Sequence, residues 1–235
     1  MTYNVHGFLG TDSVYDPDRT AAVIANSGAE IVALQEVDFG RGARAEPSAV
    51  ERLARRVAMS VHFTYTRDGK NGHFGNAVLS KHDLQLVAEG PLPRRRDEGR
   101  AVQLLQVSAG QLRFHLINTH LSVSGRERKL QVQALLGAEW MAKAGTDLPL
   151  VLCGDFNASP FSGVYRKLSQ SLVDVQGGIF DSRGTWPSRF PFWRIDHMFV
   201  TPSISVQRCV VLDRGGARTA SDHLPLLAEL LFSER

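Results

Sequence analysis

The sequence predicts an α/β protein in which many short strands are interspersed with several helices. Short apolar runs rich in Val, Ile and Leu, which are typical of buried strands, recur throughout the 235 residues. Segments with apolar residues at helical spacing lie between these runs, several of them preceded by a capping residue. No internal repeat, low-complexity tract or linker divides the chain, so we expect one domain covering residues 1–235.

The composition is that of a globular protein with a sizeable core, at 43% hydrophobic and 22% charged residues. No apolar run approaches the roughly 18 residues of a membrane span, and no secretory signal is visible, so we expect a cytoplasmic protein without an integral membrane segment. Cys153 and Cys209 lie inside apolar runs and are expected in the core rather than in a disulfide. A net charge of +3 with a pI of 9.1 suits phosphate-bearing substrates without requiring a nucleic acid.

The N-terminal part of the chain is expected to form a strand, a helix and a second strand. Met1–His6 reads as the end of a strand that would ordinarily include more residues, so we expect either a short strand or a native chain that starts upstream. Asp16-Pro17 supplies an N-cap and a first helical residue for a helix that ends near Gly28. Residues 31–34 form the next buried strand, which ends in Gln35-Glu36.

The middle of the chain is expected to hold a helix followed by several strands. Pro47 opens the helix, whose apolar positions Val50, Leu53, Ala54 and Val57 follow the i, i+3, i+4, i+7 rule. Strands are expected at residues 61–66, 76–80, 84–88, 101–107 and 112–119, the last two as a hairpin.

The remaining part of the chain alternates between helices and strands. One helix is expected from the N-cap Ser124 to about Ala144, and another from Ser159-Pro160 through Leu168. Strands are expected at residues 148–154, 194–200, 206–212 and 226–232.

Polar residues recur at the ends of these apolar strands. They are Asn4, Glu36, His120, Asp155 with Asn157, Asp196, and Asp222 with His223. Each has a local explanation as a cap, a turn or a satisfied core histidine, but six such coincidences in one chain are much less expected than one. Carboxylates and carboxamides without a thiolate favour Mg²⁺ or Mn²⁺ over zinc. Histidines can exchange protons near neutral pH or donate to a phosphoryl oxygen.

Seven segments carry a resemblance to a known family. In order they read T-Y-N-V-H, L-Q-E-V, G-N-A-V-L-S, N-T-H-L, G-D-F-N, R-I-D-H-M-F-V and S-D-H-L-P. The chain resembles the endonuclease/exonuclease/phosphatase superfamily, and within it small bacterial-type members of the deoxyribonuclease- and sphingomyelinase-like kind. This resemblance implies a four-layer α/β/β/α sandwich in which two mixed, mainly antiparallel sheets pack face to face.

The resemblance also implies a role for each matching residue. Glu36 would be the principal metal ligand, supported by Asn4 and Asp222, with Mg²⁺ or Mn²⁺ as the cofactor. Asp155 would orient or deprotonate the attacking water, and Asn157 would steady the water and the phosphate.

The remaining matches concern the phosphate. His223 would contact the scissile phosphate with Asp196 as its partner, and His120 would donate to a non-bridging oxygen or assist the leaving group. Arg100 and Asn76 match more loosely, as substrate phosphate-binding residues; a surface arginine at a strand end is nearly as good an interpretation of Arg100.

The implied function is that of a divalent-metal-dependent phosphohydrolase, in particular a phosphodiesterase, that catalyses in-line attack of activated water on a phosphoryl group. We expect a monomer acting on a phosphate ester, either in a nucleic acid or in a lipid headgroup. The alternatives are a DNA endonuclease or exonuclease, and a binding relative that lacks catalysis. A calcineurin-like phosphatase is disfavoured because its D-x-H, G-N-H-D/E and G-H-x-H motifs are absent, and no Gly-rich phosphate loop follows a strand.

Two segments bear on the substrate. Ala158-Ser159 and Phe192-Trp193-Arg194 depart from the motifs of inositol polyphosphate phosphatases, which disfavours that substrate. The aromatic stretch at residues 185–193 is interpreted either as a hydrophobic wall for a lipid or a base, or as a cover for the core.

Overall fold

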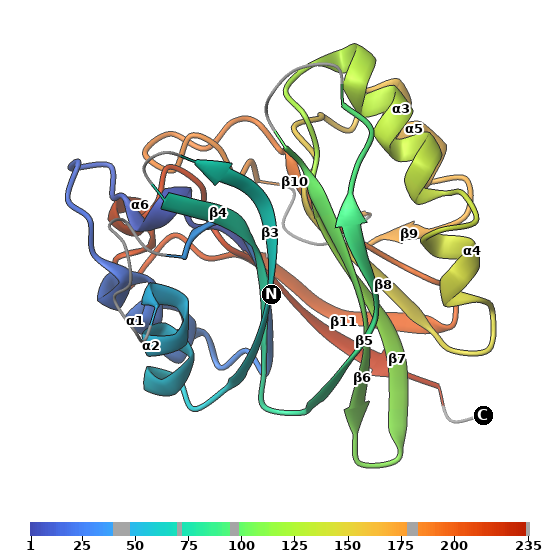
Figure 1. The fold of residues 1–235 in the computed structure, drawn as a ribbon, viewed down its shortest axis with the longest axis horizontal. Helices are drawn as coiled ribbons and strands as arrows, with labels where there is room; N and C mark the ends of the chain where they lie inside the picture. The colour runs from blue at the N-terminus through green and yellow to red at the C-terminus, as the bar shows by residue number, and fades with distance from the viewer. Residues whose placement is uncertain (40–47, 70–71, 95–98, 178–182, 234–235) are drawn as a thin grey trace.

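A computed structural model describes residues 1–39, 48–69, 72–94, 99–177 and 183–233 (Figure 1). Within these residues, two six-stranded sheets pack face to face, and helices cover the outer face of each sheet. The predicted four-layer α/β/β/α sandwich is therefore confirmed. No helix among the described residues is long and apolar enough to cross a membrane.

The first sheet combines strands from both ends of the chain. Its strand order is β11 (Ile204–Val211), β12 (Leu226–Phe232), β1 (Thr2–Asn4), β2 (Ile31–Asp38), β4 (Gly72–Ser80) and β3 (Ser60–Gly69). The β1–β2 pair is parallel and its other pairs are antiparallel, as predicted for a mixed sheet.

The second sheet is built from the continuous middle of the chain. Its strand order is β5 (Asp83–Pro91), β6 (Ala101–Ala109), β7 (Leu112–His120), β8 (Leu150–Asp155), β10 (Asp196–Val200) and β9 (Val173–Asp174). The β7–β8 pair is parallel and its other pairs are antiparallel. The short strand β9 was not predicted.

The helices divide into two outer layers. On the side of the first sheet lie α1 (Pro17–Ser27), α2 (Ala49–Arg56) and α6 (Ala217–Ala220), and on the side of the second lie α3 (Gly125–Leu135), α4 (Met141–Ala144) and α5 (Gly163–Leu168) (Figure 1). Asp16 caps α1 through the backbone N–H groups of Asp18 and Arg19, and Gly28 ends it in the left-handed conformation at φ 71°.

Two helix starts differ from the prediction, and one helix was not predicted. A capping box of Ser48 and Glu51 starts α2, and Pro47 lies outside the described residues. Ser162 caps α5 by accepting from the N–H of Tyr165, so this helix begins later than Ser159-Pro160. The short α6 was not predicted.

The single helix expected from Ser124 to Ala144 is wrong. Ser124 is the N-cap, but α3 ends at Leu135 and the chain turns at Gly137 before α4. Glycine is a poor helix former, and the buried indole of Trp140 packs close to Gly90 of β5. The break lets Trp140 cover the outer face of the second sheet.

Two buried clusters hold the layers together. The larger one fills the space between the sheets and extends under α1 and α2, where Ile24 and Leu53 are buried. The second lies between the outer face of the second sheet and the helices, and includes Leu152, Phe199 and Leu168. Both cysteines are buried and unpaired, as predicted.

Candidate active site

Strand register aligns three polar residues on the second sheet. Asp155 ends β8, where it is paired with His120 of the parallel strand β7 and with Asp196 of the antiparallel strand β10. Directly paired residues on neighbouring strands point to the same face of a sheet about 5 Å apart. All three side chains are at least 96% buried, and they form a row with Asp155 at its centre.

A bulge in β2 brings Glu36 to the same place from the first sheet. The expected strand end at Gln35-Glu36 is wrong, because β2 continues to Asp38 with a shift of register against β4 around Glu36. Glu36 adopts the left-handed conformation at φ 53°, which is costly for a residue with a side chain. The bulge turns the Glu36 side chain out of the ladder, where it is one third exposed.

A buried carboxamide network fixes this bulge to the other sheet. Asn118 of β7 donates from Nδ2 to the carbonyl oxygens of Leu34 (3.0 Å) and Ala77 (3.1 Å). Its Oδ1 accepts from Gln35 Nε2 at 2.8 Å, and Gln103 Oε1 accepts from Asn118 Nδ2 at 2.9 Å. Because buried polar groups are costly unless they are paired, this network specifies how the two sheets meet directly below Glu36.

Asn4 connects the carboxylates contributed by the two sheets. Its Nδ2 donates to Glu36 Oε1 and to Asp155 Oδ2, each at 3.0 Å, while its Oδ1 accepts from the N–H of His6 at 3.0 Å. Ser221 anchors the end of β1 by donating to the carbonyl oxygen of Asn4 at 2.8 Å. In this arrangement Asn4 presents its amino group, not its oxygen, to the two carboxylates.

His223 and Asp196 form a buried ion pair beside Asp155. His223 Nδ1 lies 2.9 Å from Asp196 Oδ2, and His223 Nε2 lies 3.7 Å from Asp155 Oδ2. Burial opposes protonation of His223, but the carboxylates of Asp196, Asp155 and Asp222 raise its pKa to about 10. His223 is therefore an imidazolium cation with a proton on Nε2.

The pKa of Asp155 is raised to about 7, first by its burial and then by the Asp196 carboxylate, against the opposing charge of His223. Its Oδ1 also accepts from the N–H of Asn157 at 2.8 Å, and Asn157 adopts the left-handed conformation at φ 48°. A carboxylate with a pKa near neutrality, held between fixed donors, can take a proton from water.

His120 differs from His223 in its protonation. Arg100 Nη1 lies 3.1 Å from its Nδ1, whereas its Nε2 lies 3.3 Å from Asp155 Oδ2 and 3.1 Å from Asn157 Nδ2, so Nδ1 faces a donor and Nε2 faces both an acceptor and a donor. Burial, the charge of Arg100 and the charge of His223 hold the pKa of His120 well below its ordinary value. His120 is neutral and links Arg100 to Asn157.

Asp222 lies at the exposed edge of this cluster, and the residues around it were not among the predicted site residues. Trp186 Nε1 donates to Asp222 Oδ2 at 3.1 Å, and His6 Nδ1 lies 3.6 Å from Asp222 Oδ1. His6 belongs to the T-Y-N-V-H segment and Trp186 to the aromatic stretch, so both carried a signal. Thr185 had none, yet its hydroxyl donates to Asp196 Oδ2 at 2.5 Å.

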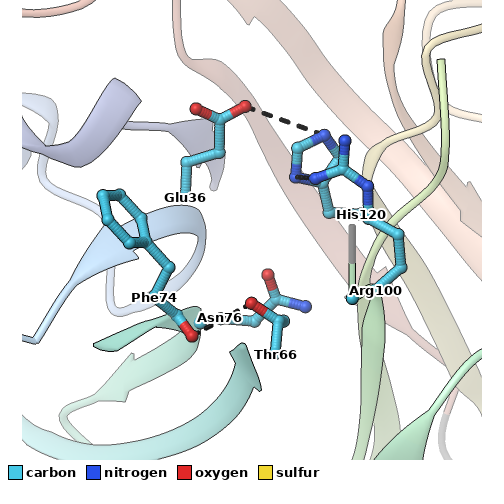
Figure 2. Close-up of a pocket in the computed structure, with 8 residues that line it drawn as sticks. Glu36, Thr66, Phe74, Asn76, Arg100 and His120 are labelled. Carbon is cyan, nitrogen blue, oxygen red and sulfur yellow. Dashed lines mark hydrogen bonds and ion pairs between the residues drawn. The ribbon is translucent and has the colours of Figure 1, made fainter. Parts of the chain in front are cut away.

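Arg100 and Asn76 line a cavity of about 210 Å³ that opens beside Glu36 and His120 (Figure 2). Thr66 and Phe74, which were not among the predicted site residues, complete its side-chain lining. The structure thus gathers all ten predicted site residues at one end of the sandwich. Their individual roles stay predictions.

The donor chemistry at this end fits a hard divalent cation. Ligand atoms of Glu36, His120 and Asp155 lie within 4.8 Å of one another. The Asn4 carboxamide and the Asp222 carboxylate add further oxygen donors, although the Asn4 oxygen is engaged by His6 in this structure. An oxygen-rich set of this kind matches the preference of Mg²⁺ and Mn²⁺.

Comparisons with known proteins agree with the fold. The model of the Endonuclease/Exonuclease/phosphatase family matches residues 1–223. The chain is 28% identical to the uncharacterized protein YbhP of Escherichia coli, covering 98% of this chain and 94% of YbhP.

Two solved structures show the same fold. A mannosyl-6-phosphatase from Bacteroides thetaiotaomicron superposes with a TM-score of 0.76 at 22% identity, over 98% of each chain. The catalytic domain of human Nocturnin superposes with a TM-score of 0.75 at 21% identity, over 98% of this chain and 93% of that one. With a family model matched from Met1 to His223, the chain belongs to the endonuclease/exonuclease/phosphatase family.

Proposed function

We propose that the protein is a divalent-metal-dependent phosphoric ester hydrolase, and in particular a phosphodiesterase. The observation that carries this proposal is the environment of Asp155. A buried carboxylate with a pKa of about 7 lies within 3.0 Å of Asn4 and 3.7 Å of a cationic histidine, beside the acidic cluster that suits a metal. This arrangement supplies a base for water and positive charge for a phosphoryl group.

Each residue of the cluster has a separate role in the proposed in-line displacement at phosphorus. Asp155 accepts a proton from the attacking water, which Asn157 helps to orient. The His223 imidazolium donates from Nε2 to a phosphoryl oxygen, and Asp196 holds the ring by accepting from Nδ1. Glu36, with Asp222 and Asn4 as further ligands, would hold a Mg²⁺ or Mn²⁺ ion, which would supply positive charge to offset charge developing on the phosphoryl oxygens.

The names of relatives support a phosphate ester as the substrate but span more than one type. The Bacteroides protein is a mannosyl-6-phosphatase, whereas a short match of 53% identity over 30 residues is to a fungal 3'-5'-exoribonuclease subunit, Ccr4. Monoesters and diesters therefore both belong in a first assay.

The test is hydrolysis of bis-p-nitrophenyl phosphate, p-nitrophenyl phosphate, plasmid DNA, abasic DNA and phospholipid vesicles with Mg²⁺ or Mn²⁺. We expect turnover that EDTA abolishes and that His223→Ala lowers by at least about 10²-fold, because this change removes the cationic donor. His82→Ala is the matched control, since His82 lies beside Glu30 rather than at the site. Turnover that persists in His223→Ala, or in EDTA, would contradict the proposal.

A further inference from the structure

The cavity beside the catalytic cluster has a fixed shape. Figure 2 shows Glu36 and His120 at one side, with Phe74, Thr66, Asn76 and Arg100 around the remaining space. Its volume of about 210 Å³ is smaller than the roughly 300–1,000 Å³ that is typical of sites for drug-sized ligands. A group attached to a phosphate at the catalytic cluster would extend directly into it.

Two glycines keep the walls of this cavity close. A Cβ atom at Gly99 would lie 1.9 Å from the carbonyl oxygen of Thr66, so the backbone there passes directly against β3. A Cβ atom at Gly7 would lie 3.1 Å from the ring of Phe74, so that ring is packed against the turn after β1. These contacts show that the backbone at Gly99 and the ring of Phe74 are closely packed on the side away from the cavity.

Asn76 contributes a buried acceptor to this cavity that the protein does not satisfy. The residue is 1% exposed, and its Nδ2 donates to the carbonyl oxygen of Ala101 at 2.9 Å. This bond fixes the orientation of the carboxamide, because the opposite orientation would set two oxygens against each other. Within the described part of the chain, Asn76 Oδ1 has no hydrogen-bond partner.

An unsatisfied buried oxygen calls for a donor from the ligand. A phosphoryl oxygen cannot supply it, since it too is an acceptor, so a role for Asn76 in binding phosphate through this oxygen is disfavoured. An ammonium group would meet the positive charge of Arg100 in the same cavity. A neutral donor fits both constraints, and an alcohol O–H is the neutral donor that the ester of a sugar or polyol carries next to its phosphate.

We propose that this cavity binds the hydroxylated alcohol portion of the substrate, a sugar or polyol phosphate ester, with Asn76 Oδ1 accepting a hydrogen bond from a substrate hydroxyl. Phe74 supplies an apolar wall for the carbon skeleton, and Thr66 adds a hydroxyl group to the lining. This inference rests on the proposed hydrolase function and specifies its substrate class.

The test compares esters that differ only in their hydroxyl groups. One pair is glucose 6-phosphate and tetrahydropyran-2-ylmethyl phosphate, for which phosphate release is followed. The other pair is p-nitrophenyl glyceryl phosphate and p-nitrophenyl propyl phosphate, for which nitrophenolate release is followed. In whichever pair is turned over, we expect kcat/KM to favour the hydroxylated ester by about tenfold or more, the effect of one hydrogen bond to a buried acceptor.

The variant Asn76→Ala should lower kcat/KM for the hydroxylated ester by about tenfold and leave the hydroxyl-free ester within about twofold. Asn26→Ala on the exposed face of α1 is the matched control, with both ratios unchanged. Equal kcat/KM of the wild-type enzyme for the two esters of a pair overturns the inference, even if Asn76→Ala does not fold. An equal loss of kcat/KM on both esters in Asn76→Ala also overturns it. If the wild-type enzyme hydrolyses neither these esters nor bis-p-nitrophenyl phosphate, the proposed hydrolase function is overturned as well.

Discussion

In the proposed mechanism, Asp196 acts through its two neighbours, His223 and Asp155. Its Oδ2 is 2.9 Å from His223 Nδ1 and also accepts from the Thr185 hydroxyl, which fixes the carboxylate against the ring of His223. The carboxylate both orients the ring and offsets the burial that opposes its positive charge.

Asp196→Asn should therefore change the pH dependence as well as the rate. Burial of His223 remains in this variant while the main source of its raised pKa is removed, so the pKa falls from about 10 towards or below its ordinary value. We expect the ratio of variant to wild-type rate to fall as pH rises, reaching about 10⁻² at pH 8. The ratio is measured from pH 5.5 to 9, with the exposed Asp18→Asn as control; a ratio that does not vary with pH would remove the pair from the mechanism.

Among elements, the bulged strand β2 has the largest effect on the site. A regular ladder would keep the side chain at position 36 within the sheet, whereas the bulge directs it to the catalytic cluster. The carboxamide of Asn118 holds this irregular segment from the opposite sheet. The position of Glu36, the proposed metal ligand, thus depends on a residue that lies below the candidate site rather than in it.

Asn118→Leu tests this dependence. The change leaves the carbonyl oxygens of Leu34 and Ala77 without this donor, and we expect unfolding in urea to show a loss of about 2–4 kcal/mol. We also expect Mn²⁺ binding by the folded protein, measured by electron paramagnetic resonance, to weaken by about tenfold or more because Glu36 is less firmly placed. Stability lost without any change in Mn²⁺ affinity would show that the network serves the fold alone.

Local signals explain which elements could be predicted from the sequence. Helix α1 has an Asp-Pro start and a glycine end, and β12 is an apolar run interrupted only by Glu229, so both were found with their bounds within a residue. The break after Leu135 has a local signal in Gly137, but the packing of Trp140 against Gly90 of a distant strand cannot be read from the local sequence. The bulge at Glu36 likewise arises from tertiary hydrogen bonds.

The residues of the candidate site also divide into those that have a local sequence signal and those that have none. Residues at strand ends could be proposed because several polar clusters interrupted apolar runs in the same way, and the structure brings them together through strand register. Thr185 could not be proposed, because a threonine 11 positions before Asp196 has no distinctive pattern. The unsatisfied oxygen of Asn76 is visible only once its neighbours are placed.

At the scale of the whole molecule, buried histidines make stability depend on pH. His197 packs with Phe156, Tyr165 and Phe199, and its Nε2 lies 2.7 Å from the carbonyl oxygen of Ala158. Burial lowers its pKa from 6.5 to about 4, with the charge of Arg194 adding to the effect. The unfolded chain therefore binds more protons between these values, so this residue's contribution to stability is lost as pH falls from 6.5 to 4.

His197→Phe should reduce this sensitivity. From its pKa shift, His197 accounts for about 3 kcal/mol of wild-type stability lost between pH 6.5 and 4. At pH 7.5 we expect the variant to be about 1 kcal/mol less stable, because the bond to Ala158 is gone, and the difference should shrink or reverse near pH 4.5. Urea unfolding in EDTA measures both proteins; parallel pH profiles would show that His197 does not titrate with unfolding.

The strand order also determines when the molecule becomes competent during synthesis. Strands β5 to β10 are consecutive in the sequence and can pair while translation continues, but β1 waits for its antiparallel neighbour β12. Asp222 and His223 immediately precede that neighbour. A nascent chain in which β12 has not yet been made therefore has an incomplete first sheet, and a product that terminates before Asp222 would lack both this residue and His223, the proposed donor to the phosphate.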